Sequence, residues 1–293
     1  MLRVLLALFA LAMIPSAGLA QDQRAEWNRP VPPFRIAGNV YYVGTAGIAS
    51  YLITDPAGHV LIDGAMEESA DRIAGNIRAL GFRIEDVKYL LVSHAHWDHV
   101  GGLAALQRLS GARLVVAAGD GDAMATGITA YRDDVGTFPP VRIDRLIGEG
   151  ETVTIGTTIL TARMTPGHTR GGTSWTMTTR EGDRNLDILF ACSLTVAGQR
   201  LVGDARYPEA ARDFEASFDR LDALRADVFL GSHTGMFDFE AKRARLVAGN
   251  VLAFVDPAEL PAQVARARTA FAEELARQSA AATSAAEVPS SQD

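Results

Sequence analysis

The chain has a single cysteine, no cluster of basic residues and, after its first twenty residues, no long hydrophobic run. With Cys192 alone no internal disulfide can form, so the thiol is a buried packing group, a metal ligand or an intermolecular link. A net charge of −7 with scattered basic residues argues against nucleic acid as a partner. The composition, 48% hydrophobic and 22% charged, is typical of a globular protein that buries a full core.

The first twenty residues are the exception to this lack of apolar runs. They read MLRVLLALFALAMIPSAGLA, with Arg3, an apolar stretch and small residues before QDQ. This pattern predicts a secretory signal peptide (1–20) that is cleaved after Ala20, and therefore a periplasmic protein. An uncleaved anchor is the alternative, but the run is short for a membrane span and no stop-transfer pattern follows. No later segment predicts a span, so we expect no stable membrane association.

The mature chain predicts one α/β domain (21–275). Its start (21–38) is rich in proline and polar residues and predicts an extended arm. Strand and helix patterns then alternate, and they return in a looser form after an irregular segment from Gly119 to Pro140. The end (276–293) has low complexity and predicts a disordered tail. Predicted strands lie at 40–44, 87–93, 113–118, 151–165, 172–193 and 226–232, and two more lie within 49–64, joined by a turn at 55–58. Predicted helices lie at 67–81, 101–111, 209–226 and 258–278.

Four apolar strand patterns each end in a residue that can do chemistry. YLLVS is followed by His94, LTARMTPG by His168 and VFLGS by His233, while ILFAC runs into Ser193. In layered α/β folds, ligands collect outside the carboxyl ends of strands. We therefore expect these distant residues to converge on one site.

The densest cluster has the spacing H-x-H-x-D-H, with His94, His96, Asp98 and His99. On an extended or tightly turning segment His94 and His96 can share one ion, while Asp98 and His99 turn toward another. Imidazole and carboxylate ligands suit zinc, and three protein ligands leave a position for water. His168 and His233 would complete two such sites. A purely structural role hardly accounts for the cluster, whereas a lone histidine after a strand is often only a hydrogen-bonding group.

Two further residues have simpler interpretations. His59 lies in the turn PAGHV and is expected at the surface. Trp97, inside the cluster, is expected to be a packing residue.

The residues quoted above resemble the signature of the metallo-beta-lactamase superfamily. Further segments occur in the order of that family and are similar to class B beta-lactamases of the third subclass. They are VYYVGTAGIASYLI, HVLIDGAMEESADRIAGNIRALGF, HAHWDHVGG, FPPVRIDRLI, TPGHTRGGTSW, CSLTVAGQRLV and DVFLGSH.

The resemblance implies a four-layer αββα sandwich that binds two zinc ions. It assigns His94, His96 and His168 to the first zinc, and Asp98, His99 and His233 to the second. Other members carry a cysteine or a bridging aspartate where Ser193 stands, so a water or hydroxide would bridge the ions here. Cys192 is out of register with that position and is interpreted as a packing residue.

The implied activity is zinc-dependent hydrolysis of beta-lactam antibiotics, namely penicillins, cephalosporins and carbapenems, which confers antibiotic resistance. In this hypothesis the bridging hydroxide attacks the lactam carbonyl, and Asp98 anchors the second zinc and orients the hydroxide. Ser193 and Thr195 would bind the substrate carboxylate. Tyr131 and Phe138, in the irregular segment, would form one wall of an open groove.

Alternatives remain at this stage. A thioester or lactone hydrolase of the same superfamily would use the same ligands, and a non-catalytic exported zinc-binding protein would also hold metal. The chain departs from the family beside two ligands, at Arg170 and Thr234, which bears on loop shape and substrate preference. We expect a monomer that acts on a small-molecule substrate.

Overall fold

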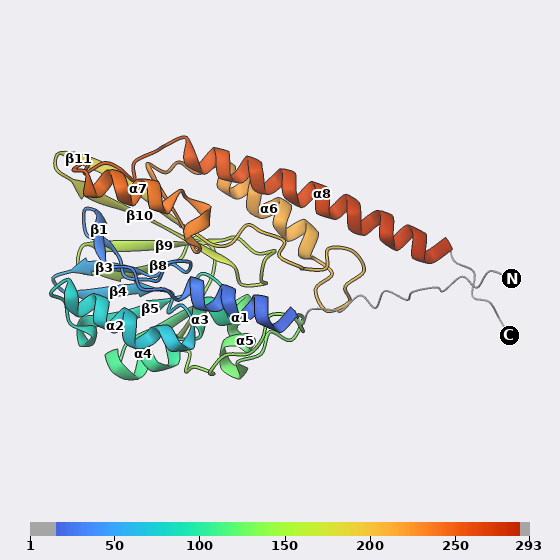
Figure 1. Ribbon diagram of the computed structural model, residues 1–293, viewed down its shortest axis with the longest axis horizontal. Coiled ribbons are helices and arrows are strands. Elements are labelled where there is room, and N and C mark those ends of the chain that lie inside the picture. The colour runs from blue at the N-terminus through green and yellow to red at the C-terminus, as the bar shows by residue number, and fades with distance from the viewer. Residues whose placement is uncertain (1–15, 288–293) are drawn as a thin grey trace, which may run out of the picture.

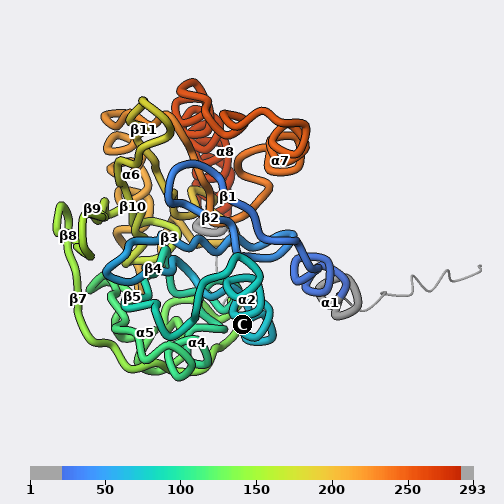
Figure 2. Tube along the Cα trace, turned by 90° about the vertical axis from the view of Figure 1, so that its left-hand side faces the viewer, coloured from blue at the N-terminus to red at the C-terminus, as the bar shows by residue number. Residues whose placement is uncertain are grey.

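Two β-sheets face each other in the centre of the molecule and helices cover both outer faces, as the computed structural model shows for residues 16–287 (Figure 1). Helices α2 to α5 lie on one side and α6 to α8 on the other. This is the predicted four-layer αββα sandwich. In the view from the side, α1 lies at the flank of the N-terminal half (Figure 2), and its Trp27 stacks on Trp97 of α3.

The first sheet contains seven strands in chain order. Neighbours from β1 to β4 are antiparallel, whereas β4, β5, β6 and β7 run parallel. The parallel strands therefore place their carboxyl ends on one edge of the sheet. The strands are β1 (Phe34–Ala37), β2 (Val40–Tyr42), β3 (Tyr51–Asp55), β4 (Gly58–Ile62), β5 (Val87–Leu91), β6 (Arg113–Ala117) and β7 (Arg145–Ile147).

The second sheet has five strands in the order β12-β11-β10-β9-β8. All neighbours are antiparallel except β11 and β12, which run parallel. Residues alternate between buried and exposed along β8, because one face packs on the core, whereas β12 is buried throughout. The strands are β8 (Thr152–Ile155), β9 (Thr158–Met164), β10 (Thr173–Glu181), β11 (Arg184–Ala191) and β12 (Val228–Gly231).

The helices arise where apolar residues recur at helical spacing. In α6, for example, Phe214, Phe218 and Leu221 share the buried face. The helix α4 ends at Gly111, which adopts a left-handed conformation (φ 69°). The helices are α1 (Ser16–Trp27), α2 (Ala70–Ala79), α3 (Trp97–Val100), α4 (Leu103–Ser110), α5 (Gly121–Thr126), α6 (Ala210–Asp222), α7 (Phe239–Val247) and α8 (Glu259–Glu287), with short 3-10 turns η1 (Glu67–Ser69), η2 (Ile84–Asp86), η3 (Ala118–Asp120) and η4 (Thr234–Met236).

Two apolar clusters hold the layers together. The larger one fills the space between the sheets and continues beneath α6 and α8. The smaller one lies between the first sheet and helices α2 to α5. These clusters occupy the inner faces of the sheets, and the polar residues singled out from the sequence lie beyond the strand ends.

The structure corrects three predictions about irregular segments. Residues 21–27 of the predicted extended arm are helical, because the prolines begin only at Pro30 and the residues before them favour helix. The predicted disordered tail is helical as far as Glu287, since its alanines extend α8. The segment from Gly119 to Pro140 is irregular only in part, because it contains the end of η3 and the short helix α5.

The predicted signal peptide falls mostly outside the described residues, and α1 covers its last five positions. Among residues 16–287, no helix has the length and apolar character that crossing a membrane would require.

Candidate metal centre

The cluster of histidines lies where the first sheet meets a short helix. After β5 ends at Leu91 the chain bends at Ser93 and turns tightly at Ala95, where His96 N donates to the carbonyl oxygen of His94 (3.1 Å), and α3 begins after His96. This turn brings His94 and His96 together, with ring centroids 4.9 Å apart. Asp98 and His99 occupy the first turn of the helix and therefore point elsewhere.

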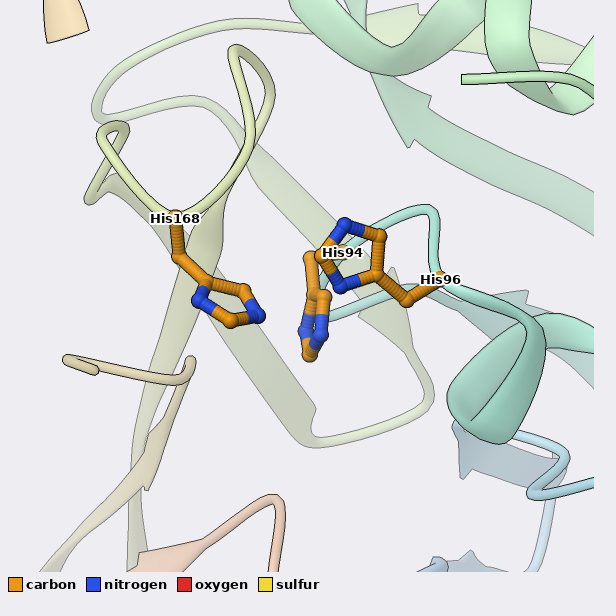
Figure 3. Close-up of side chains that lie close together, drawn as sticks. All are labelled: His94, His96 and His168. Atoms are coloured by element: carbon orange, nitrogen blue, oxygen red, sulfur yellow. The ribbon is translucent and has the colours of Figure 1, made fainter. Parts of the chain in front are cut away.

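His168 joins the first pair from the other half of the molecule. It lies in the loop between β9 and β10, and its ring centroid is 4.6 Å from that of His94 and 4.7 Å from that of His96. Figure 3 shows the three rings converging from two separate loops. All three residues are buried, and one nitrogen from each lies within 4.8 Å of the others. We call these three residues the three-histidine group.

A second set of possible ligands lies directly beside the first. His99 Nε2 is 3.0 Å from His233 Nε2, and Asp98 Oδ2 is 3.3 Å and 3.4 Å from these two nitrogens. His233 reaches this position because it follows β12 and bridges to Ile48. The rings of His94 and His99 are 4.1 Å apart, so the sets adjoin. We call Asp98, His99 and His233 the aspartate group.

In two residues of the three-histidine group, His168 and His94, the Nδ1 atom has a polar partner. His168 Nδ1 donates a hydrogen bond of 2.7 Å to the carbonyl oxygen of Thr195. His94 Nδ1 lies 3.0 Å from Ser93 Oγ. With Nδ1 engaged, each ring presents Nε2 to the centre, which is how protein ligands are oriented for a metal.

Asp63 supports the aspartate group. It follows β4 in a left-handed conformation (φ 59°), which is uncommon for a residue other than glycine. Its carboxylate accepts hydrogen bonds from Ser93 N (2.7 Å) and Ser93 Oγ (2.6 Å), and it lies 3.4 Å from His99 Nδ1. A backbone held in this conformation beside a cluster of histidines indicates a functional role.

Unpartnered nitrogens show that the centre is suited to a metal. Within residues 16–287, His94 Nε2 and His96 Nε2 are buried and have no hydrogen-bond partner. Leaving a buried polar atom without a partner is costly. In the aspartate group, the Nε2 atoms of His99 and His233 are 3.0 Å apart, close to the separation of about 3.3 Å that two nitrogens have on a tetrahedral zinc. The nitrogen atoms therefore fit a shared cation far better than hydrogen bonding.

The pKa of His99 is shifted in the opposite direction from the pKa values of the other four histidines of the centre. Burial lowers the pKa of His94 and His96 well below the usual value, that of His168 to about 4 and that of His233 to about 3. His99 differs: burial opposes its charge, but the carboxylates of Asp98 and Asp63 raise its pKa to about 10. The neutral imidazoles can accept a metal directly, whereas His99 must first lose a proton.

Solvent reaches the centre from the side of His233, whose side chain is 26% exposed while that of His99 is fully buried. A cavity of about 380 Å³ lies there, lined in part by Trp27, Gly47 and His233. The ring of Trp27 packs edge-on against His233 (5.2 Å) and stacks on Trp97 (6.4 Å). Trp97 is thus a packing residue, as expected, and it anchors the end of α1.

Ser193 and Thr195 lie close to the three-histidine group. Their hydroxyl oxygens are 3.0 Å apart, and the Thr195 carbonyl holds His168. Ser193 is buried and Thr195 exposed, so the Thr195 hydroxyl is the more accessible group.

Tyr131 and Phe138 do not form an open groove wall, because each is only 6% exposed. Tyr131 Oη accepts a hydrogen bond from Arg170 N (3.0 Å), and Phe138 belongs to the smaller apolar cluster. The prediction placed them on the surface because the segment has no periodicity, yet tertiary packing buries both rings.

Cys192 is fully buried and belongs to neither ligand group, in agreement with a packing role. His59 lies outside both groups, where it packs edge-on against Phe82 (5.1 Å).

Two carboxylates of the centre were missed from the sequence. Asp63 follows the apolar pattern HVLI at a strand end, which is the same signal that pointed to His94 and His233. Asp120, which hydrogen-bonds to both loops of the three-histidine group, lies where the pattern is lost, so nothing in the sequence marked it.

Comparison with known proteins places this geometry in a family. Residues 43–233 match the model of the metallo-beta-lactamase superfamily. Among solved structures, the chain resembles BJP-1, a subclass B3 metallo-beta-lactamase of Bradyrhizobium japonicum, with 41% identity, a TM-score of 0.84, and coverage of 87% of this chain and 98% of that one. It also resembles the FEZ-1 metallo-beta-lactamase of Legionella gormanii, with 38% identity, a TM-score of 0.84, and coverage of 86% and 98%.

Curated relatives are more distant and are matched only in part. A hydroxyacylglutathione hydrolase of Bradyrhizobium is 28% identical over 54% of this chain and 52% of its own length. A UPF0173 metal-dependent hydrolase of Anaeromyxobacter dehalogenans is 32% identical over 32% of this chain and 45% of the length of that relative. The family match and the two ligand groups together indicate a dinuclear metal site. The chain belongs to the metallo-beta-lactamase superfamily, and within it the chain resembles the class B beta-lactamases of the third subclass.

Proposed function

We propose that the protein is a zinc-dependent beta-lactamase that hydrolyses the lactam amide of penicillins, cephalosporins and carbapenems. The observation that carries this proposal is the likeness to BJP-1, named as a subclass B3 metallo-beta-lactamase, at 41% identity over 98% of that chain. A metal ligand set of five imidazoles and one carboxylate supports zinc, because this donor set is typical of it.

The chain's own residues divide the work of such a reaction. His94, His96 and His168 would hold one zinc, and Asp98, His99 and His233 would hold the other. When bound, two such ions lower the pKa of a shared water and polarise a carbonyl oxygen. Asp98, with one oxygen near His99 and His233, would bind metal and orient the nucleophilic water.

The substrate carboxylate is assigned to the end of β11. Ser193 and Thr195 offer paired hydroxyls beside His168, and hydroxyls bind carboxylates directly or through water. Ser193 supplies neither a thiolate nor a carboxylate to the metals, which supports the likeness to the third subclass. No covalent intermediate with the chain is needed.

A thioester hydrolase is the second candidate, since curated relatives include hydroxyacylglutathione hydrolases. The metal groups would serve either reaction, because both begin with attack on an activated carbonyl. The partial coverage of those relatives makes this the weaker candidate.

Substrate competition separates the two. The purified protein is assayed with a chromogenic cephalosporin, benzylpenicillin and a carbapenem, alongside a lactone and a glutathione thioester, each with and without a chelator. We expect lactam turnover that is lost on chelation and restored by zinc. Fast thioester or lactone turnover, with lactam hydrolysis no faster than in buffer, would refute the proposal.

We also propose that the protein acts as a monomer in the periplasm and confers resistance to beta-lactams. The signal-peptide pattern of residues 1–20 supports export. Expression in a sensitive bacterium should raise the inhibitory concentration of ampicillin, and the periplasmic fraction should contain a chain that begins at Gln21. A full-length chain in the cytoplasm would contradict the proposed export.

A further inference from the structure

A buried carboxylate that the proposed reaction does not use lies behind the three-histidine group. Asp120, at the end of η3, is 1% exposed. Its Oδ2 accepts hydrogen bonds from Ala95 N and Thr169 Oγ1, and its Oδ1 accepts one from Gly171 N, each at 2.8 Å. These three donors come from two different loops, so one side chain connects them.

The two loops are those that carry the three histidines. Ala95 lies between His94 and His96, while Thr169 and Gly171 follow His168. The first loop belongs to the N-terminal half and the second to the C-terminal half. Asp120 is therefore placed to set the distance between the paired histidines and the third.

Neighbouring contacts fix the same peptide from the other side. Thr129 Oγ1 donates to the carbonyl oxygen of Ala95 (3.0 Å). The backbone N–H and the carbonyl of Ala95 are therefore both held by the segment that follows β6. Tyr131 Oη accepts from Arg170 N (3.0 Å), which adds a further bond to the second loop. The segment from Asp120 to Tyr131 thus contacts both loops.

The loops approach so closely that glycine is required at the contact. A Cβ atom on Gly171 would lie 2.4 Å from Asp120 N, and one on Gly119 would lie 2.4 Å from the carbonyl oxygen of Arg170. Such backbone contact leaves little freedom for the carboxylate to move away. Its three bonds therefore act on a rigid arrangement.

The charge of Asp120 also suits a nearby cation. All three of its partners are uncharged, although a buried carboxylate is costly unless positive charge lies close. Two divalent ions, with Asp98 as the only carboxylate among the six ligands, would leave a strongly positive centre. Asp120 supplies negative charge on the side where the three-histidine group has none.

We infer that Asp120 is a positioning residue for the first metal ion: its carboxylate holds the His168 loop at ligand distance from His94 and His96 and so sets the affinity of the three-histidine group. This inference rests on the metal binding in the proposed function but not on the substrate. It predicts that loss of the Asp120 carboxylate lowers zinc affinity beyond what a similar loss of folding stability elsewhere in the molecule causes.

Asp55 offers a matched control for a purely structural role. It is also buried (7% exposed), and it accepts hydrogen bonds from Ala57 N, Thr157 N and the hydroxyls of Thr157 and Thr158. It too connects two segments, the turn after β3 and the turn after β8. That first turn lies at the amino end of β4, the sheet edge opposite to the centre.

The experiment isolates one ion at a time. In a His233→Ala background, in which the aspartate group is incomplete, zinc affinity is measured by competition with a chromogenic chelator, and stability by urea unfolding of the metal-free protein. Asp120→Asn keeps the shape but places an amide N–H against a backbone N–H. It should weaken zinc binding about 10- to 100-fold, as loss of partners around a ligand does. Asp55→Asn should destabilise similarly yet change affinity less than about twofold, because distant sites act independently.

Two further variants keep the test decisive. Thr169→Val removes one donor to Asp120 and should weaken zinc binding less than Asp120→Asn does, with little added loss in the double variant, since both break the same bond. In a His168→Ala background, Asp120→Asn should leave the affinity of the aspartate group unchanged.

Equal effects of Asp120→Asn and Asp55→Asn on zinc affinity, or no effect of Asp120→Asn, would overturn the inference. If the parent His233→Ala protein bound no zinc at all, the metal assignment itself would be wrong and the inference would fall with it. Zinc binding without lactam hydrolysis would refute the proposed activity alone.

Discussion

The two ligand groups share one buried edge of the sandwich but are held together in different ways. The three-histidine group draws neutral imidazoles from two halves of the chain, and its geometry depends on partners outside it, namely Thr195, Ser93 and Asp120. The aspartate group contains a carboxylate of its own, because Asp98 lies against both of its histidines.

This difference gives the groups different chemical characters. A metal held by neutral nitrogens keeps its full positive charge, which suits the polarisation of a carbonyl. Asp98 would partly neutralise a metal in its group, and His99, whose proton Asp98 and Asp63 stabilise, would have to lose that proton to serve as a ligand. The first group is positioned by uncharged and charged partners around it, whereas the second depends on carboxylate charge, from Asp98 within it and from Asp63 beside His99.

Removal of one ligand from each group should have the largest effect and tests whether the groups are unequal. His168→Ala should lower kcat/KM for a cephalosporin by at least about 10³-fold, because a Lewis acid contributes several kcal/mol to catalysis. His233→Ala should lower it less, by about 10²-fold at limiting zinc, since Asp98 and His99 remain as ligands. Steady-state kinetics at several zinc concentrations check this. Full activity of either variant would contradict the ligand assignment.

The pH dependence of the metal-free protein should show opposite signs for His168 and His99. His168 has a native pKa of about 4 against 6.5 ordinarily, so it stabilises fully above pH 6.5 and its contribution is lost as the pH falls toward 4. His99, with a pKa of about 10, stabilises fully below pH 6.5 and loses that contribution as the pH rises toward 10.

Urea unfolding across pH 5 to 9 measures both effects. His168→Gln should flatten the acid side of the profile and His99→Gln the alkaline side. His59→Gln, which lies outside both groups, serves as the control. A profile unaffected by the first two substitutions would show that His168 and His99 do not differ in protonation.

The aromatic contact on His233 tests whether the aspartate group depends on α1. Trp27→Ala should destabilise the protein by about 1–2 kcal/mol, because Trp27 is only half buried, and should speed zinc loss from the aspartate group. Phe82→Ala is the matched control, since Phe82 packs in the same edge-on manner on His59. Stopped-flow zinc release in a His168→Ala background compares the two. Equal release rates would mean that α1 does not support this group.

The smallest effect should come from the hydroxyls beside the three-histidine group. Thr195→Val removes a hydroxyl but keeps the carbonyl that holds His168. It should raise KM about tenfold with kcat nearly unchanged, because one hydrogen bond to the substrate carboxylate contributes about 1.5 kcal/mol. Ser193→Ala provides the comparison. A fall in kcat without a change in KM would place these residues in the chemistry and not in binding.

The ligands could be predicted from the sequence because they follow strands. His94, His168 and His233 each come after an apolar run, and sheet topology alone brings such ends together. The spacing H-x-H-x-D-H also predicted that His94 and His96 belong to one group and that Asp98 and His99 turn toward another, whereas the short helix α3 was not predicted. Strand and helix patterns thus predicted an α/β domain and the convergence of the centre, whereas the four-layer sandwich was implied by the family resemblance.

Other features depend on contacts between distant segments. Tyr131 and Phe138 are buried by packing that no local pattern reveals, and Asp120 acts through hydrogen bonds to residues 25, 49 and 51 positions away. The helical residues 21–27 were obscured by the prolines that follow, although proline restricts mainly its own position and the one before it.

Zinc titration of the metal-free protein, followed by the rate of cephalosporin hydrolysis, tests the central claim most directly. We predict negligible hydrolysis without metal, a rise as zinc is added, and a plateau at two ions per chain, counted by native mass spectrometry. Hydrolysis at the full rate by metal-free protein, or no hydrolysis once two ions are bound, would contradict a dinuclear beta-lactamase centre.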